Sequence, residues 1–237
     1  MRSSTGLSRS WPVSTEQLHW FRKPGTNSPK DKGTFNPVFE LLDYPIVAGR
    51  ADEIFFADAE VSLTYEDALD RVAKFAGILR AVHEPAPPFL VVGDGLRPVT
   101  LILAMLAALR LGSCVVLGAK GLKPGERNAA PVLRPIEGAP AEAGVHIGAN
   151  GDAAVQTAAK AGMHTGTRKI WSHFEGTELL ADGPESKPLD AGALMKESAF
   201  KHAAAAEIGP GREVLRLDGV SLSAAESLNA VEMFLSR

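Results

Sequence analysis

The clearest pattern of apolar and polar residues runs from Leu63 to Gly118 and predicts a helix, a strand, a second helix and a second strand. In the stretch 64–82, apolar side chains recur every three or four residues, which is typical of a helix that buries one face. Thr64 precedes this stretch and Asp67 follows three residues later. This pair is a variant of the capping box, so it predicts that the helix begins at Thr64.

Two short apolar strands flank the second helix. Residues 89–93 and 114–118 are rich in β-branched side chains, whereas 98–109 is apolar on every side. Pro98 suits the first helical turn, and Gly112 suits the position just after the last turn. Two apolar strands joined by a buried helix predict a β–α–β crossover, and strands that are apolar on both faces belong to a parallel sheet covered by helices.

The chain is expected to divide into an arm and one domain. Residues 1–33 are polar and rich in turn-forming residues, so we expect a mobile N-terminal arm that the aromatic pair Trp20-Phe21 holds loosely. Residues 34–237 are expected to form an α/β domain, which begins with a helix in 36–48.

Weaker patterns predict the remaining elements. In the first half they are a hairpin from 54–56 and 61–63, a long loop or a poorly formed helix and strand in 121–144, and a strand in 144–148. In the second half they are a short helix from Asp152 to Ala161, a strand in 168–174, a turn-rich break in 183–188, an amphipathic helix in 189–208 and a strand in 214–217. A last helix is capped by Ser221 or Ser223 and continues to Leu235. Because strands alternate with helices through most of the chain, we expect three layers with a mostly parallel sheet covered by helices.

Composition narrows the class of protein. At 237 residues, with 45% hydrophobic and 22% charged residues, the chain resembles ordinary soluble proteins. The net charge of −3 gives no sign of binding to nucleic acid or to an anionic membrane, so we expect neither partner. The single Cys114 excludes a framework of intramolecular disulfides and fits a reducing cytosol, so we expect a cytoplasmic protein.

Neither membrane insertion nor secretion is predicted. The apolar stretch 98–109 is shorter than the roughly 20 residues that a membrane-spanning helix needs. The N-terminus lacks the apolar centre of a secretory signal. Its arginines and serines make a transit peptide conceivable, but a disordered tail is the favoured interpretation.

Common catalytic and metal-binding patterns are missing from the sequence. The six histidines form no HExxH or HxH group and one cysteine cannot build a thiolate zinc site, so we expect no metal. There is no GxSxG nucleophile motif. Gly93-Asp94-Gly95 follows a strand but lacks the third glycine and the later acidic residue of a dinucleotide-binding motif, so it is interpreted as the crossover loop. No catalytic residue is assigned.

Two segments resemble core motifs of the adenylate-forming superfamily, which includes acyl-CoA synthetases, nonribosomal-peptide adenylation domains and luciferases. Residues 49–53 and 62–68 are similar to the first motif and its lead-in, and 106–117 resembles the second. The pairs Trp20-Phe21, Phe35-Asn36, Leu42-Asp43 and Gly49-Arg50 look like the entrance to the acetyl- and propionyl-CoA synthetase branch. The resemblance covers residues 20–118 and implies the fold of the superfamily's N-terminal subdomain.

A third motif of the superfamily is a loop rich in Ser, Thr and Gly that ends in Pro-Lys and holds ATP phosphates. Here Thr165, Gly166, Thr167 and Lys169 match it, so the resemblance implies that they contact ATP. The segment is shorter than the superfamily's loop and lacks its proline. The favoured alternative is an ordinary turn that leads into a strand, because short motifs often match by chance.

Several functional parts of the superfamily have no counterpart in this sequence. They are the adenine-contacting segment, the ribose-binding Asp, the hinge and the C-terminal domain with its catalytic Lys. The resemblance therefore implies a truncated acid–thiol (acyl-CoA) ligase that lacks most catalytic motifs.

Three hypotheses follow. In the first, the chain binds a nucleotide, a small carboxylic acid or CoA weakly and acts as a regulator or subunit. In the second, it is one half of a two-chain acid–CoA ligase that forms an acyl-adenylate from ATP. In the third, it is a structural interaction module. In the last case a partner chain or a second copy caps the sheet edge.

Overall fold

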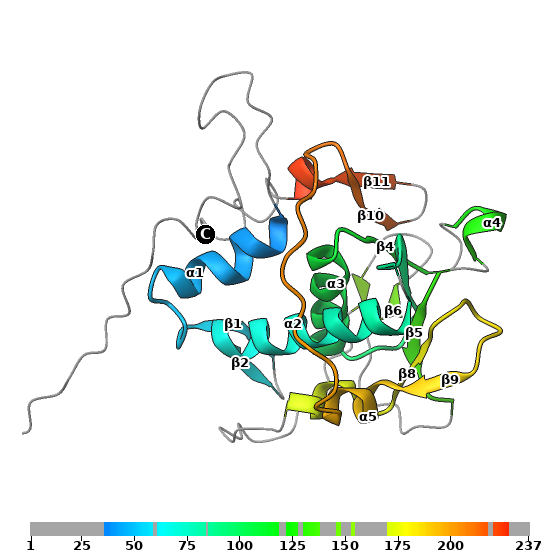
Figure 1. Ribbon diagram of the computed structural model, residues 1–237, viewed down its shortest axis with the longest axis horizontal. Coiled ribbons are helices and arrows are strands. Elements are labelled where there is room, and N and C mark those ends of the chain that lie inside the picture. Colours follow the sequence, from blue (N-terminus) through cyan, green and yellow to red (C-terminus); the bar gives the residue numbers. More distant parts are fainter. Residues whose placement is uncertain are drawn as a thin grey trace, which may run out of the picture.

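The computed structural model describes residues 36–58, 61–83, 85–118, 122–127, 130–137, 146–147, 153–154, 170–217 and 220–227. They form an α/β fold around a seven-stranded sheet with the order β11-β10-β4-β3-β5-β8-β9 (Figure 1). The strands of this sheet are β3 (Phe89–Val92), β4 (Cys114–Leu117), β5 (Val132–Pro135), β8 (Thr177–Leu180), β9 (Pro188–Asp190), β10 (Glu213–Leu217) and β11 (Val220–Ser223).

The sheet is parallel at its centre and antiparallel at both edges. Strands β10, β4, β3 and β5 run parallel to one another. Strand β11 pairs antiparallel with β10, and β8 and β9 extend the other side in antiparallel order. The predicted α/β class and the predicted β–α–β crossover from 89 to 118 are thus confirmed.

Helices α2 (Tyr65–Val82) and α3 (Pro98–Arg110) pack against each other and against one face of the sheet. The Thr64 Oγ1 atom accepts a hydrogen bond of 3.1 Å from the Asp67 backbone N–H, which confirms the predicted N-cap of α2. Gly112 follows α3 with a φ of 75°, a conformation that side chains rarely adopt, so it ends the helix as predicted.

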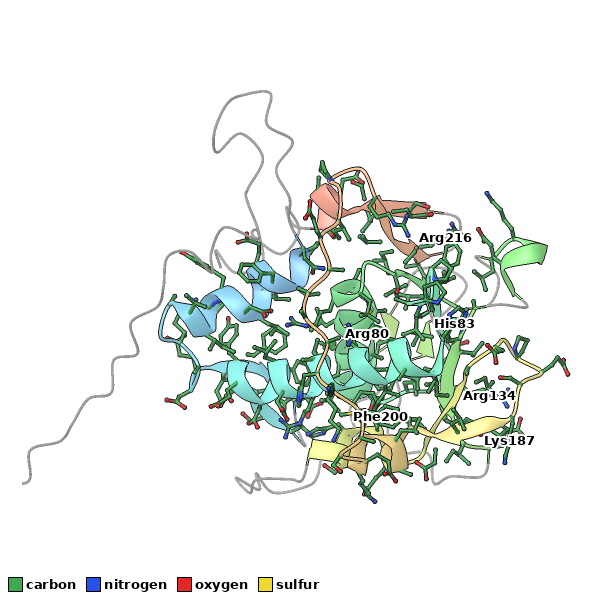
Figure 2. The ribbon with its side chains drawn as sticks, viewed as in Figure 1. Arg80, His83, Arg134, Lys187, Phe200 and Arg216 are labelled. Atoms are coloured by element: carbon green, nitrogen blue, oxygen red, sulfur yellow. The ribbon has the colours of Figure 1, made fainter. Side chains whose placement is uncertain are left out.

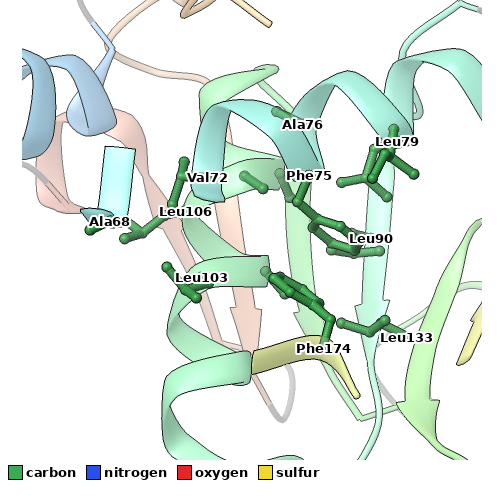
Figure 3. Close-up of a cluster of buried hydrophobic side chains, with 14 of the residues drawn as sticks. Ala68, Val72, Phe75, Ala76, Leu79, Leu90, Leu103, Leu106, Leu133 and Phe174 are labelled. Atoms are coloured by element: carbon green, nitrogen blue, oxygen red, sulfur yellow. The ribbon is translucent and has the colours of Figure 1, made fainter. Parts of the chain in front are cut away.

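The main core lies between these helices and the sheet. Side chains of α2 and α3 meet Leu90, Val115 and Leu133 of the strands (Figure 3). The rings of Phe75 and Phe174 stack there with their centroids 4.4 Å apart. The opposite face of the sheet carries a smaller buried cluster, which contains Val91, Cys114, Val116, Leu122 and Ala130.

Several other predictions are confirmed. The helical stretch near the start consists of η2 (Phe39–Asp43) and α1 (Tyr44–Val47), and the hairpin consists of β1 (Ile54–Ala57) and β2 (Ser62–Thr64). The segment 121–144 contains a helical turn α4 (Pro124–Arg127) and strand β5. Turns occupy 183–186. Ser223 caps the first turn of the predicted last helix at 224–227, where its hydroxyl bonds to Glu226, and the rest of that helix lies outside the described residues. The short strand β6 (His146–Ile147) lies within the predicted strand 144–148.

Three predictions of secondary structure are wrong. Strand β7 (Ala153–Ala154) pairs with β6 where a helix from Asp152 was expected. A 3₁₀ helix, η4 (Ile170–Phe174), replaces the strand expected in 168–174, and the strand comes later as β8. In place of one helix over 189–208 the chain forms β9, a short helix α5 (Ala191–Lys196) and an extended segment.

The extended segment, residues 197–207, crosses α2 and α3 and is called the strap here. Its Ala203 and Ala206 N–H groups donate to the Ala73 and Arg110 carbonyls at 2.9 and 2.7 Å. These partners belong to other helices, so the strap's backbone is satisfied without forming a helix of its own. The alanine-rich sequence of this segment predicted a helix, because a local pattern cannot reveal hydrogen-bond partners that lie far along the chain.

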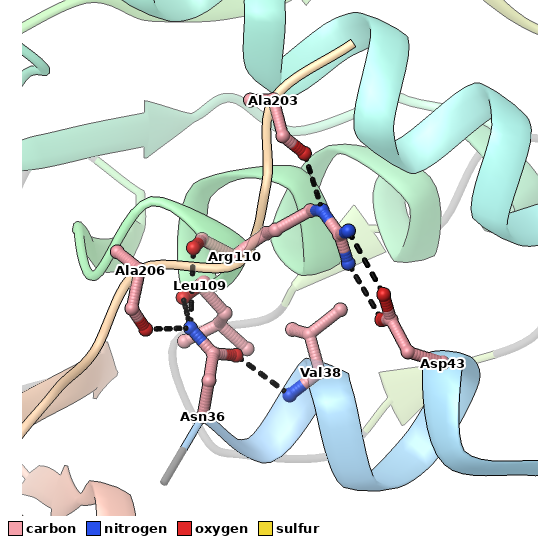
Figure 4. A network of polar contacts seen from close by, with 7 residues as sticks. All are labelled: Asn36, Val38, Asp43, Leu109, Arg110, Ala203 and Ala206. Carbon is pink, nitrogen blue, oxygen red and sulfur yellow. Dashed lines mark hydrogen bonds and ion pairs between the residues drawn. The ribbon is translucent and has the colours of Figure 1, made fainter. Parts of the chain in front are cut away.

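A buried polar network joins the strap to α3 and to the start of the described chain (Figure 4). Asn36 Nδ2 donates to the Leu109, Arg110 and Ala206 carbonyls. The Arg110 guanidinium donates to both carboxylate oxygens of Asp43, at 2.6 and 2.9 Å, and to the Ala203 carbonyl. This network fixes the backbone at residue 36, where the described chain begins. The N-terminal arm predicted for residues 1–33 lies outside the described residues.

In the part of the chain that the structure describes, no helix combines the length and the apolar character that crossing a bilayer requires.

Candidate ligand site at the carboxyl ends of the parallel strands

The order of the parallel strands creates a switch point between β3 and β5. From β3 the chain crosses to β4 on one side, and it then returns to β5 on the other side of β3. In open α/β sheets, ligands bind outside the carboxyl ends of the strands at such a point. Here the loop 93–97 after β3 and residues 136–137 after β5 border this position.

The loop after β3 brings the backbone close to β5. The Gly93 N–H donates to the Leu133 carbonyl at 2.8 Å. A Cβ atom on Gly93 would lie 3.1 Å from the Cβ atom of Arg134, so glycine permits this close approach of the two backbones. Gly95 has a φ of 85°, which makes the tight turn possible, and Asp94 is exposed at its tip.

Arg134 is a partly exposed cation at this switch point. Side chains alternate along a strand, so Arg134 lies on the same face of the sheet as Val132 and opposite to α2 and α3. Its Nε atom lies 2.7 Å from Glu178 Oε1 on the neighbouring strand β8. The Arg134 side chain, labelled in Figure 2, lies on β5. It is 40% exposed, whereas the Glu178 side chain is only 12% exposed. The exposed part of the guanidinium can therefore bind a ligand while its Nε–H group donates to Glu178.

Segment η4 packs at the start of α3, beside the same loop. Arg97 Nη2 donates to the Ser172 carbonyl at 2.6 Å, and Thr100 Oγ1 donates to the His173 carbonyl. Thr100 and His173 are both buried. These hydrogen bonds explain why 170–174 forms a turn of helix held against α3 where a sheet strand was predicted.

The residues predicted to contact ATP, Thr165, Gly166, Thr167 and Lys169, lie outside the described residues. The described chain resumes one residue later, at Ile170. Arg134 was not predicted from the sequence, because a single arginine between an apolar residue and a proline matches no known motif. Only its pairing with Glu178 and its position beside Gly93 distinguish it from other surface arginines.

A second charged cluster lies on the same face of the sheet, at β10. Arg216 donates to Glu213 and Glu126 at 2.7 and 2.9 Å, and its guanidinium lies 5.2 Å from the centre of the Phe89 ring. The hydrogen bond from Arg216 holds the pKa of Glu213 down at about 2. Because two carboxylates and a ring surround it, Arg216 serves to join β10 to α4.

Neither cysteine nor metal chemistry is supported by the described geometry. Cys114 is buried, and this burial raises the pKa of its thiol to about 11, so it stays protonated at neutral pH. Within the described ranges, no three His, Cys, Asp or Glu side chains come together as metal ligands would.

Comparisons with known proteins give two partial structural matches. A benzoate CoA ligase from Burkholderia xenovorans LB400 matches 38% of this chain and 18% of its own, with 26% identity and a TM-score of 0.28. Apo MatB from Rhodopseudomonas palustris matches 80% of this chain and 34% of its own, with 12% identity and a TM-score of 0.43. The chain thus spans about a third or less of the length of either match. At these TM-scores the matches establish neither a family nor an activity.

No protein-family model matches the chain, and a search of curated proteins found no match either.

Proposed function

We propose that this chain binds an anionic ligand at the switch point between β3 and β5, and that it is a ligand-binding or regulatory relative of the acid–CoA ligases it resembles. The observation that carries the proposal is the partly exposed Arg134 guanidinium on β5, beside the loop that follows β3. A guanidinium pairs with phosphate or carboxylate through two parallel hydrogen bonds, so nucleotide phosphates and small carboxylic acids fit this site chemically.

Complete ligation by these 237 residues alone is not part of the proposal. The sequence lacks counterparts of the adenine-contacting, ribose-binding and catalytic-lysine motifs of the superfamily that it resembles. Loss of even one preorganised donor at a reacting centre typically costs about 2.7–4 kcal/mol of transition-state stabilisation. We expect exchange of pyrophosphate into ATP to stay at background with acetate, propionate or longer acids. Exchange above background would contradict this expectation.

The binding site is tested by melting the protein with increasing ATP, AMP, inorganic phosphate or acetate. A ligand that binds only the folded chain raises the melting temperature by mass action. Arg134→Gln should weaken binding about 10- to 100-fold, because a hydrogen bond to a charged group contributes about 1.5–3 kcal/mol. Arg80→Gln is the matched control, since Arg80 is exposed on the last turn of α2, before β3 begins.

A second variant tests the direction of the effect. Glu178→Gln keeps Arg134 but removes the carboxylate that competes with an incoming anion. It should strengthen binding of the same anion that Arg134→Gln weakens. If Glu178→Gln leaves the affinity unchanged, or if none of the four compounds shifts the melting temperature of the unaltered chain, the proposed site is wrong.

The segment Thr165, Gly166, Thr167 and Lys169 remains the proposed contact for ATP phosphates. Its support is the resemblance and the fact that η4, which begins at the next residue, is anchored beside the switch point. Lys169→Ala should weaken binding of ATP and leave the affinity for acetate unchanged. A clear dependence on Lys169 would favour the two-chain acid–CoA ligase, in which a partner supplies the missing motifs. If ATP binding is unchanged in this variant, the segment is an ordinary turn.

A further inference from the structure

The helical stretch formed by η2 and α1 carries an exposed apolar surface. Tyr44 and Val47 are 51% and 41% exposed, and their spacing of three residues places them on one face of the helix. Strand β1 lies at the same end of the molecule as α1 (Figure 1). Its first residue, Ile54, is 57% exposed. Large apolar side chains this exposed, gathered at one end of a chain, often mark a docking surface. We call Tyr44 and Val47 the α1 face.

Charge distinguishes this end of the molecule from the segment that precedes it. Residues 36–67 contain eight Asp or Glu and a single Arg, whereas residues 1–35 contain six Lys or Arg and two Asp or Glu. The acidic residues near the α1 face include the exposed Asp52 and Glu66. The basic segment also contains the aromatic pair Trp20-Phe21, followed directly by two further basic residues. Opposite charge and matching apolar groups favour an encounter between the two segments.

The length of the N-terminal segment and the place where it ends allow this encounter. The network around Asn36 fixes the end of the segment at α3 and the strap (Figure 4). From Asn36 to Val47 the helical stretch extends about 16 Å at 1.5 Å per residue. The 15 residue steps from Phe21 to Asn36 can span up to about 50 Å. The segment can therefore double back along the helix, and its Pro24-Gly25 pair favours a turn.

We propose that the α1 face is the docking surface for this chain's own N-terminal arm, with Trp20 and Phe21 packed against Tyr44 and Val47. Tethering gives the arm a local concentration in the millimolar range, so docking requires little intrinsic affinity. The proposal concerns a surface distant in sequence from Arg134 and does not depend on the proposed ligand site.

Disulfide trapping in the full chain tests the proposal. The variant His19→Cys/Ala48→Cys places one thiol beside Trp20 and one beside the α1 face, and leaves the docking side chains in place. The native Cys114 is buried and its raised pKa keeps it unreactive, so it does not compete. With oxidised glutathione as the oxidant, we expect a disulfide within one chain to form at least about tenfold faster than in the control His19→Cys/Lys187→Cys. Lys187 is exposed in the turn before β9.

The outcome separates the possible occupants of the surface. Adding Tyr44→Ser to the first pair should slow the reaction toward the control rate, whereas adding Trp11→Ser, elsewhere in the arm, should leave it unchanged. A disulfide between two chains would mean that a second copy covers the α1 face and would overturn the proposal. Equal rates for the two cysteine pairs, or no effect of Tyr44→Ser, would also overturn it.

Discussion

At the scale of single residues, buried charged groups join segments that lie far apart in the chain. Arg110 lies at the end of a helix that is otherwise apolar, and its side chain is 7% exposed. It bridges Asp43, before α1, and the Ala203 carbonyl of the strap. A buried guanidinium is tolerated only when its donors are satisfied, so this residue requires both segments to be in place.

Replacing Arg110 by alanine should therefore destabilise the protein by about 3–5 kcal/mol, because the Asp43 carboxylate would be left partly buried without its partner. Urea unfolding followed by circular dichroism measures the change. Arg80→Ala, an exposed arginine of α2, should stay within about 0.5 kcal/mol of the unaltered chain. Similar midpoints for the two variants would show that the network contributes little to stability.

The lowered pKa of Glu213 predicts that the stability of the protein depends on pH in the acid range. The folded pKa of Glu213, about 2, lies below the usual glutamate value of 4.5, because Arg216 donates to its carboxylate. A lowered carboxyl pKa contributes stability that is present above pH 4.5 and is lost as the pH falls toward 2. Glu213→Gln should thus lose about 1 kcal/mol near neutral pH, after screening by solvent, and show a shallower decline of the urea midpoint between pH 5 and pH 2. Glu185→Gln, in an exposed turn, should keep the steeper decline.

At the scale of elements, the strap approaches α2 so closely that only glycine fits at the point of contact. A Cβ atom on Gly77 of α2 would lie 1.9 Å from the Lys201 carbonyl oxygen. In an ordinary helix interior, glycine is less favourable than alanine by about 1 kcal/mol. Here the strap lies so close that residue 77 must have no side chain, so glycine is preferred over alanine at this position.

Gly77→Ala should therefore destabilise the protein by about 1–3 kcal/mol, as overpacked sites do, although alanine favours helix. Thermal unfolding measures the sign of the change. The control is Gly125→Ala in α4, where a Cβ atom would meet nothing within 4 Å, and its melting temperature should not fall. A stabilised Gly77→Ala variant would mean that the strap does not lie this close to α2 in solution.

At the scale of the whole molecule, the candidate ligand site and the α1 face lie on different elements of the fold. The switch point lies between β3 and β5, whereas the α1 face lies on the helical stretch next to residue 36. Changes in the arm are thus expected to affect stability without affecting anion binding at Arg134.

Deleting residues 1–19 should leave the melting temperature nearly unchanged, because this segment offers little apolar surface to bury. Deleting residues 1–21 should lower it further, since Trp20 and Phe21 are then lost as well. Anion affinity should be the same in both deletions. A large loss of stability from the shorter deletion would show that residues 1–19 form an integral part of the domain.

The sequence by itself determined the central unit of the fold. Apolar periodicity and end signals were sufficient for α2, β3, α3 and β4, because these depend on burial of a face and on local caps such as Thr64 with Asp67. Patterns were insufficient for η4, the strap and the antiparallel strands β8 and β9, whose conformations follow from partners far along the chain, such as Thr100 for His173 and Ala73 for Ala203. Arg134 likewise became a candidate for ligand binding only when β5 was placed beside Gly93 and Glu178. Hydrogen bonds between distant segments have no periodicity in the sequence, so tertiary structure alone decided these features.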